Sequence, residues 1–141
     1  MITFWDTSAA INALVSPEVY TRLKTGRHVA RPHMLAEFFS IMTGRGIRTI
    51  DSEHQEIQIV MSAEDVVKWL KEFCAKLDWV DLDGPEAIQS LNRAERLGVL
   101  GGRVYDYLHA EAAKKAGAER LLTRNIKHFQ NLTGTVRLEW P

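Results

Sequence analysis

The sequence of 141 residues has only one cysteine, no excess of either charge and no long apolar run free of charges. Because Cys74 has no partner, a disulfide within the chain is excluded, which fits a reducing compartment. The 18 basic and 18 acidic side chains cancel, so a generally basic nucleic-acid binder is not indicated, although a local basic patch is compatible with this balance. The longest charge-free apolar stretch near the start, residues 7–17, is too short to cross a bilayer, and no basic signal-peptide segment precedes it. We therefore predict a cytoplasmic protein without a membrane segment.

The sequence does contain enough apolar residues for a core. Hydrophobic residues make up 45% of the chain, and the length suits a single domain over residues 1–141. Apolar and β-branched runs predict strands at 2–5, 27–31, 57–61, 79–82, 121–122 and 136–138, the third of them with weak flanks. Helical patterns are found at 8–15, 18–24, 33–43, 62–76, 85–98 and 103–116. This alternation of strands and helices predicts an α/β fold with a largely parallel sheet.

Four polar side chains stand at positions where a parallel sheet gathers its ligands. Asp6 directly follows the first strand, and Asn125 follows the strand at 121–122. Glu37 and Asp106 lie in helices, and a helical wheel directs both away from the charged faces. Ligands of open parallel sheets collect outside the carboxyl ends of the strands, so we expect the four side chains to converge at one edge.

The helix at 103–116 illustrates why such a carboxylate needs a partner. Glu111, Lys114 and Lys115 cluster on one side, which we interpret as the solvated face, and Asp106 falls roughly 130° from the centre of that cluster. Burying an unpaired carboxylate is costly, so a partner is expected beside it. Carboxylates plus an amide, without an obligatory histidine or thiolate, suit Mg²⁺ or Mn²⁺ and disfavour zinc. Such ions activate bound water for phosphodiester hydrolysis, which is the reaction class we predict.

Three segments together resemble one known family. They read FWDTSAAINAL at the start, LAEFFSIMTG in the middle and GGRVYDYLHAEAAKKAGAERLLTRNIKHF near the end. In these segments the chain resembles PIN-domain nucleases, and most of all the VapC-type toxins of toxin–antitoxin pairs. The resemblance covers nearly the whole length in the right order. It implies a three-layer α/β/α sandwich around a largely parallel sheet of four to five strands, with an acidic pocket for one or two divalent ions.

The resemblance also assigns roles to individual residues. Asp6, Glu37 and Asp106 match the three acids of the family's pocket, and Asn125 matches a fourth position that is often aspartate. The small hydroxyl residues that support the pocket are matched by Ser8 and Thr123. Because the amide leaves three formal negative charges instead of four, we expect one well-occupied Mg²⁺ or Mn²⁺ ion and weaker binding of a second.

Substrate and partners follow from the same resemblance. It implies cleavage of single-stranded or loop RNA, a small antitoxin that covers the pocket, and a homodimer. Arg124 and Lys127 lie next to the matched positions and are candidates for contacting RNA phosphates. The apolar helices at 8–24 and 33–43 are candidates for presenting the antitoxin groove.

Each candidate also has a structural interpretation that involves no catalysis. Asp6 is typical of a helix cap, and Glu37 is placed to pair with Arg31 or Arg45. His109 could line the pocket, but an ordinary packed histidine is the commoner role for such a residue. These interpretations are open at the level of the sequence.

Three other functions also remain open. A phosphatase of the haloacid dehalogenase type would use Asp6 as its nucleophile, but it requires a second aspartate where Ser8 stands. The amide at Asn125 is compatible with a catalytically weak PIN-like module that binds RNA or protein. A PIN nuclease of RNA processing, acting without an antitoxin, is the third. Metal-dependent RNA cleavage, compared between wild type and Asp6→Asn, distinguishes a nuclease that uses this site from a phosphatase or a non-catalytic binding module.

Overall fold

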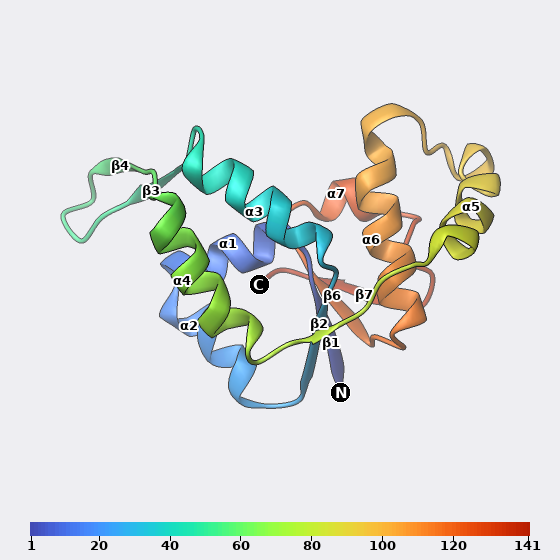
Figure 1. Ribbon diagram of the computed structural model, residues 1–141, viewed down its shortest axis with the longest axis horizontal. Helices are drawn as coiled ribbons and strands as arrows, with labels where there is room; N and C mark the ends of the chain where they lie inside the picture. The colour runs from blue at the N-terminus through green and yellow to red at the C-terminus, as the bar shows by residue number, and fades with distance from the viewer.

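A five-stranded parallel sheet with helices on both faces forms the centre of the computed structural model, which describes residues 1–141 (Figure 1). The strands are β1 (Ile2–Trp5), β2 (Arg27–Ala30), β5 (Asp78–Trp79), β6 (Arg120–Leu122) and β7 (Arg137–Glu139). They lie in the order β5-β2-β1-β6-β7, and every pairing between neighbours is parallel. The predicted α/β fold, a three-layer sandwich with a largely parallel sheet of four to five strands, is confirmed.

Seven α-helices and three 3-10 helices accompany this sheet. The α-helices are α1 (Thr7–Val15), α2 (Pro17–Thr21), α3 (His33–Thr43), α4 (Ala63–Cys74), α5 (Gly84–Asn92), α6 (Val104–Lys115) and α7 (Ile126–Phe129). Among the 3-10 helices, η1 (Arg22–Lys24) follows α2 and η2 (Glu95–Leu97) follows α5. The third, η3 (Gly101–Arg103), directly precedes α6. None of the helices is both long and apolar enough to cross a bilayer.

Consecutive residues of the central strands point to opposite faces and so build two separate cores. Trp5 and Leu122 pack with residues of α1 to α4 on one face. Phe4 and Leu121 pack with residues of α6 and α7 on the other face. Strands buried on both faces are apolar without interruption, which is why β1 and β6 read as short continuous apolar runs in the sequence. The two cores hold the carboxyl ends of β1 and β6 in fixed positions.

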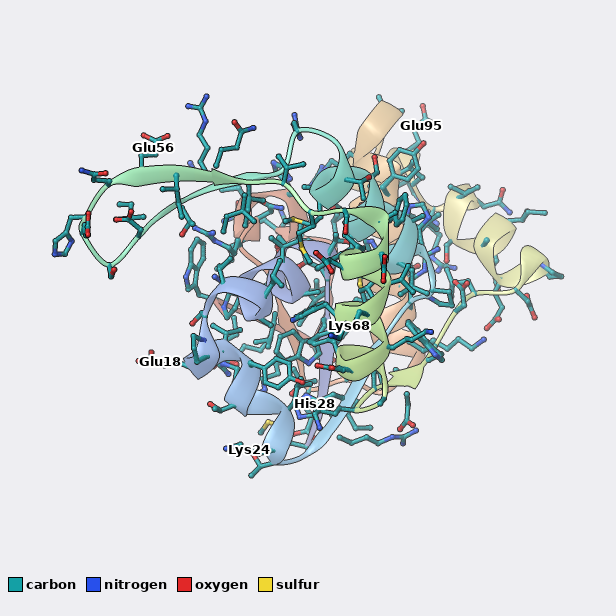
Figure 2. All side chains as sticks on the ribbon, turned by 60° about the vertical axis from the view of Figure 1, so that its left-hand side comes forward. Glu18, Lys24, His28, Glu56, Lys68 and Glu95 are labelled. Atoms are coloured by element: carbon teal, nitrogen blue, oxygen red, sulfur yellow. The ribbon has the colours of Figure 1, made fainter.

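A projecting hairpin is the part of the fold that the sequence predicted least well. Strands β3 (Ile47–Ile50) and β4 (Glu56–Ile59) pair antiparallel and extend away from the body of the molecule, with Glu56 on the hairpin far from the sheet (Figure 2). The prediction contained only a weak strand at 57–61, and β3 was not assigned. No residue of either strand is fully buried, and the apolar alternation is short and flanked by polar residues, so the sequence marks the hairpin only weakly.

The strand predicted at 79–82 is shorter than expected and ends at Trp79. Beyond it, the Asp81 carboxylate accepts the Leu82 backbone N–H and an N–H of Arg31. Asp83 then caps α5 by accepting the backbone N–H of Glu86. These local hydrogen bonds shape a loop in place of a longer strand.

The prediction that Glu111 lies on a solvated face is wrong. Glu111 is 7% exposed, and its carboxylate accepts hydrogen bonds from Arg93 at 2.7 Å and from Lys114 at 2.9 Å. The hydroxyl of Tyr107 lies 3.1 Å from the same carboxylate. The helical wheel failed because α5 and the segment after it pack on this side of α6 and bring Arg93 to it. A wheel describes one helix and contains no information about its neighbours.

Candidate active site

The carboxyl ends of β1 and β6 lie side by side at the centre of the sheet. From β1 the chain moves outward to β2 and β5, and it then returns to the other side of β1 to form β6 and β7. Open parallel sheets bind ligands outside the strand ends at such a reversal of strand order. Asp6 directly follows β1 here, and its backbone N–H donates to the carbonyl of Leu122 at 3.2 Å. Thr123 follows β6 at the same edge.

Asp6 is anchored from three directions. It is 3% exposed, and its Oδ1 accepts the backbone N–H of Ala9 at 2.8 Å and the hydroxyl of Ser8 at 2.7 Å. Its Oδ2 accepts the hydroxyl of Thr123 at 2.6 Å. Burial raises the pKa of Asp6, while the hydrogen bonds from Thr123, Ala9 and Ser8 act in the opposite direction. Asp6 therefore caps α1, as its position predicted, and is also held rigidly at the strand end.

The two predicted hydroxyl residues connect Asp6 to the chain after β6. The Ser8 hydroxyl accepts the backbone N–H of Arg124 at 2.9 Å. The Thr123 hydroxyl accepts the backbone N–H of Asn125 at 2.9 Å. Each hydroxyl donates to Asp6 and accepts from the 123–125 segment, so the acid and this segment keep a fixed relative position.

Glu37 enters the site from α3, with only one of its carboxylate oxygens engaged. Its Oε1 accepts the Thr7 hydroxyl at 2.9 Å and lies 2.8 Å from Nε2 of His109. Its Oε2 has no hydrogen-bond partner in the structure. Burial alone would raise the pKa of Glu37, but hydrogen bonding to His109 and Thr7 and the nearby imidazole groups of His109 and His33 outweigh it, and the pKa is lowered.

His109 is a site residue whose contact the sequence did not predict. It is 2% exposed, and its Nδ1 lies 3.5 Å from Nη1 of Arg31. A guanidinium group can only donate, so Nδ1 accepts and the ring proton of a neutral His109 stays on Nε2, facing Glu37. Arg31 itself pairs with Asp81 at 3.0 Å, so the predicted pairing of Glu37 with Arg31 or Arg45 is not formed. The available signal was spacing, because His109 lies three residues after Asp106 on α6.

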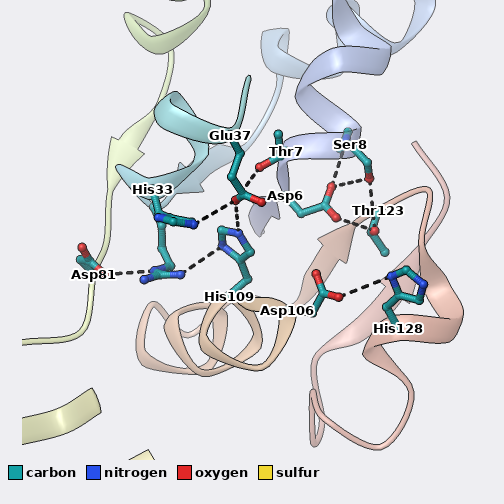
Figure 3. Close-up of polar contacts among 12 residues, drawn as sticks. Asp6, Thr7, Ser8, His33, Glu37, Asp81, Asp106, His109, Thr123 and His128 are labelled. Atoms are coloured by element: carbon teal, nitrogen blue, oxygen red, sulfur yellow. Dashed lines mark hydrogen bonds and ion pairs between the residues drawn. The ribbon is translucent and has the colours of Figure 1, made fainter. Parts of the chain in front are cut away.

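Asp106 faces the same space from the first turn of α6. Its Oδ2 lies 3.4 Å from Nδ1 of His128, and its Oδ1 has no hydrogen-bond partner. Burial raises the pKa of Asp106 and the negative charge of Glu37 adds to this effect, while His128, His109 and Arg103 oppose it. Figure 3 shows the side chains of Asp6, Glu37 and Asp106 converging from three different elements.

The fourth predicted residue, Asn125, is placed differently. Only its backbone N–H takes part in the network, and its side chain makes no hydrogen bond. Asn125 instead lines a neighbouring cleft together with Ser8, Arg124 and Trp140. The predicted RNA contact Lys127 lines a small polar pocket that also contains Asp106. No three acidic, imidazole or thiol side chains are gathered closely enough to ligate one ion by themselves.

The topology and the edge at which these residues gather define the class as a PIN-like α/β/α fold. Two solved structures share it over almost the entire chain. The first is "VapBC2 from Rickettsia felis bound to a DNA fragment from their promoter", which is similar over 100% of this chain and 99% of that chain, with a TM-score of 0.69 and 20% identity. The second is VapBC-1 from nontypeable Haemophilus influenzae, with 99% and 98% coverage, a TM-score of 0.67 and 17% identity. No family model and no curated protein matches the sequence. At such low identity the shared feature is the fold.

Proposed function

We propose that this chain is a VapC-type PIN nuclease, a divalent-metal-dependent endoribonuclease that acts as the toxin of a toxin–antitoxin pair. The observation that carries the proposal is a pair of carboxylate oxygens without partners. Oε2 of Glu37 and Oδ1 of Asp106 accept no hydrogen bond, whereas Asp6 and Oε1 of Glu37 are firmly hydrogen-bonded. Both oxygens are open to solvent, because every buried side-chain oxygen of the structure has a partner. Partly buried carboxylate oxygens that face one open crevice are available to coordinate a cation.

The residues present fit Mg²⁺ or Mn²⁺. Oxygen ligands suit these hard ions, and Mg²⁺ usually binds only one or two carboxylates while keeping several waters. A crevice in which no three ligating side chains come close together is compatible with that mode. Glu37 and Asp106 would hold the ion directly, with Asp6 beside them. When bound, the ion supplies an activated water and neutralises charge that develops on the scissile phosphate.

The remaining residues position the acids and the substrate. Ser8 and Thr123 fix Asp6, and Thr7 and His109 fix Glu37, so neither acid needs to reorganise when a phosphodiester binds. Lys127 lies in the polar pocket beside Asp106, where its charge favours the approach of an RNA phosphate. Asn125 would contribute through a bound water, since its side chain lies outside the hydrogen-bonded network.

The partners in this proposal are a small antitoxin and a second copy of the chain. Both similar structures are described as VapBC assemblies, which supports an antitoxin. An exposed apolar groove of about 480 Å³ between α3 and α4 supports protein docking. Leu35, Phe39, Val67 and Trp79 are among its lining residues. This groove uses the predicted helix at 33–43 but pairs it with α4 in place of the segment at 8–24. The homodimer and the cytoplasmic location stay predictions.

Cleavage of single-stranded RNA in the presence of Mn²⁺ or Mg²⁺ tests the nuclease. We expect Asp6→Asn, Glu37→Gln and Asp106→Asn each to lower the rate by more than about 100-fold, since each removes charge from the metal crevice. Asp78→Asn is the matched control, because Asp78 is an exposed acid that pairs with Arg27 at the edge strand β5. EDTA should abolish cleavage by the wild type. Equal cleavage by wild type and Asp6→Asn would refute the proposal.

The antitoxin is tested separately from the chemistry. If the chain is a toxin, its expression alone should arrest growth, and co-expression of a small protein encoded beside it should relieve the arrest. Metal-dependent cleavage without growth arrest would instead indicate a PIN nuclease of RNA processing. An absence of cleavage together with RNA binding would indicate the non-catalytic module that Asn125 left open.

A further inference from the structure

A second cleft lies directly beside the acidic crevice and has no role in the function proposed above. Its volume is about 380 Å³, and residues of α1, α3, β3 and the two segments after β6 and β7 surround it. Ser8 and Asn125 line it on the side of the crevice. Because the Ser8 hydroxyl donates to Asp6, anything bound in the cleft lies next to the acids.

The chemistry of the cleft is aromatic, apolar and cationic. Ile11, Ile41 and Ile47 form an apolar wall. Trp140 is 52% exposed, and the guanidinium carbon of Arg124 lies over its indole ring, 5.3 Å from the ring centroid. A tryptophan that is exposed to this extent does not belong to the core, and its free aromatic face is typical of a stacking surface. Bases of single-stranded nucleic acids stack on such aromatic and guanidinium planes.

The charge of the cleft favours an anionic strand as its occupant. Two arginines, Arg45 and Arg124, line it, and no acidic residue does. The backbone of an RNA strand is attracted to such a site, whereas the acids of the neighbouring crevice repel it unless a cation is present. A paired base in a helix is already stacked on its neighbours, so only an unpaired base is free to enter.

We propose that this cleft binds one unpaired base of an RNA strand, next to the phosphate in the acidic crevice, by stacking on Trp140 and Arg124. The inference rests on the proposed nuclease function for the identity of the strand. It places the selection of unpaired RNA, which the family resemblance implies, at this particular cleft. It also assigns a substrate-binding role to Trp140.

Binding of a fluorescein-labelled single-stranded RNA octamer, followed by anisotropy with Mg²⁺ in an Asp6→Asn background, tests the cleft without the need for cleavage. We expect Trp140→Leu, which keeps apolar bulk without an aromatic face, to weaken binding between about fivefold and about a hundredfold. Trp140→Phe should retain most of the affinity. Ile88→Ala is the surface control, because Ile88 is 62% exposed on α5 and lines neither the cleft nor the polar pocket beside Asp106. Thermal unfolding of each variant checks that it is folded.

An abasic RNA identifies the contact itself. Removal of one base at the position bound in the cleft should weaken wild-type binding and leave the binding of Trp140→Leu unchanged, because the stacking partner is already missing. Equal octamer affinity in wild type and folded Trp140→Leu would overturn the inference. So would a Trp140→Leu variant that binds RNA normally but no longer associates with a protein partner, since the cleft would then be a protein surface.

The two proposals can fail separately. If Asp6→Asn cleaves as well as wild type while Trp140→Leu loses RNA affinity, the nuclease site is wrong and the base-binding cleft stands. If the acids are essential for cleavage while Trp140→Leu binds the octamer and cleaves it with an unchanged KM, only the cleft is refuted.

Discussion

The hydrogen bonds of Glu37 explain how a single carboxylate can be rigid and still open to a ligand. Thr7 and His109 both approach Oε1, which leaves Oε2 free. Arg31 holds the other nitrogen of His109, so the ring cannot turn its proton away from Glu37 without losing that contact. Partners of this kind orient ligating groups in metal sites and affect metal affinity without touching the metal.

Substitution of His109 tests this positioning role. We expect His109→Ala to weaken Mn²⁺ binding and to lower kcat by about 10- to 100-fold, since Glu37 loses its orienting donor. His109→Gln, which offers an amide N–H to Glu37, should recover much of the loss. Titration calorimetry with Mn²⁺ gives a readout that does not depend on turnover. His54→Asn is the control, because His54 is exposed in the turn of the β3–β4 hairpin and contacts none of the acids of the crevice. Wild-type Mn²⁺ affinity in His109→Ala would contradict the positioning role.

The sequence could single out Asp6 and Asp106, two of the three acids that lie together in the structure, because each has a local signature. Asp6 follows an apolar run that ends abruptly, and Asp106 is turned away from the cationic side of its helix. The contacts of His109 have no such signature, because they depend on how α3 and α6 approach each other across the strand ends. Asn125 shows the opposite case, in which a matching sequence position does not bring the side chain into the hydrogen-bonded network.

At the scale of elements, α5 is held against α6 by charged side chains of very different burial. Glu111 of α6 is buried, and its carboxylate accepts a hydrogen bond from Arg93, which follows α5. Lys115 of α6 pairs with Glu86 of α5 at 2.6 Å in an exposed position. Exposed pairs contribute little to stability because water screens them, whereas hydrogen bonds between a buried carboxylate and charged donors contribute more.

This difference predicts unequal effects of two similar substitutions. Glu111→Ala should lower the free energy of unfolding by about 1–3 kcal/mol, because Tyr107, Lys114 and Arg93 lose a shared acceptor. Lys115→Ala, which removes the exposed pair but keeps the contact of Glu86 with the Asp83 backbone, should leave that free energy nearly unchanged. Urea unfolding followed by circular dichroism measures both. Equal losses in the two variants would show that burial of Glu111 does not determine its contribution.

The helices and strands differ in how well the sequence predicts them. The strands and helices that bury a face were recognised to within a few residues, because burial imposes a period on the sequence. No residue of the hairpin of β3 and β4 is fully buried, so only a short alternation at 57–59 marks it. The burial of Glu111 was not predicted because a helical wheel describes α6 alone, and the residues that cover Glu111 come from α5 and the segment after it.

At the scale of the whole molecule, the stability of the sheet depends on a buried histidine between its central strands. His28 on β2 accepts the indole N–H of Trp5 on β1 at 3.0 Å through Nδ1, and its Nε2 lies 2.8 Å from the carbonyl of Thr25. Both contacts require neutral imidazole with its proton on Nε2. Burial lowers the pKa of His28, and the positive charge of Arg120 lowers it further, while hydrogen bonding to Thr25 opposes the change.

This lowered pKa predicts how unfolding depends on pH. In the unfolded chain His28 takes up a proton as the pH falls below 6.5, its ordinary pKa, whereas the folded protein resists protonation. The unfolded state then binds more protons, so the free energy of unfolding decreases with falling pH, by no more than about 1.4 kcal/mol per pH unit from this group. His28→Gln keeps an acceptor and a donor but does not titrate. Denaturant unfolding of both proteins from pH 7.5 to 5 isolates the effect, since the acids of the crevice are common to both. The wild type should lose stability relative to His28→Gln below pH 6.5, and parallel curves would show that His28 is not kept neutral by the fold.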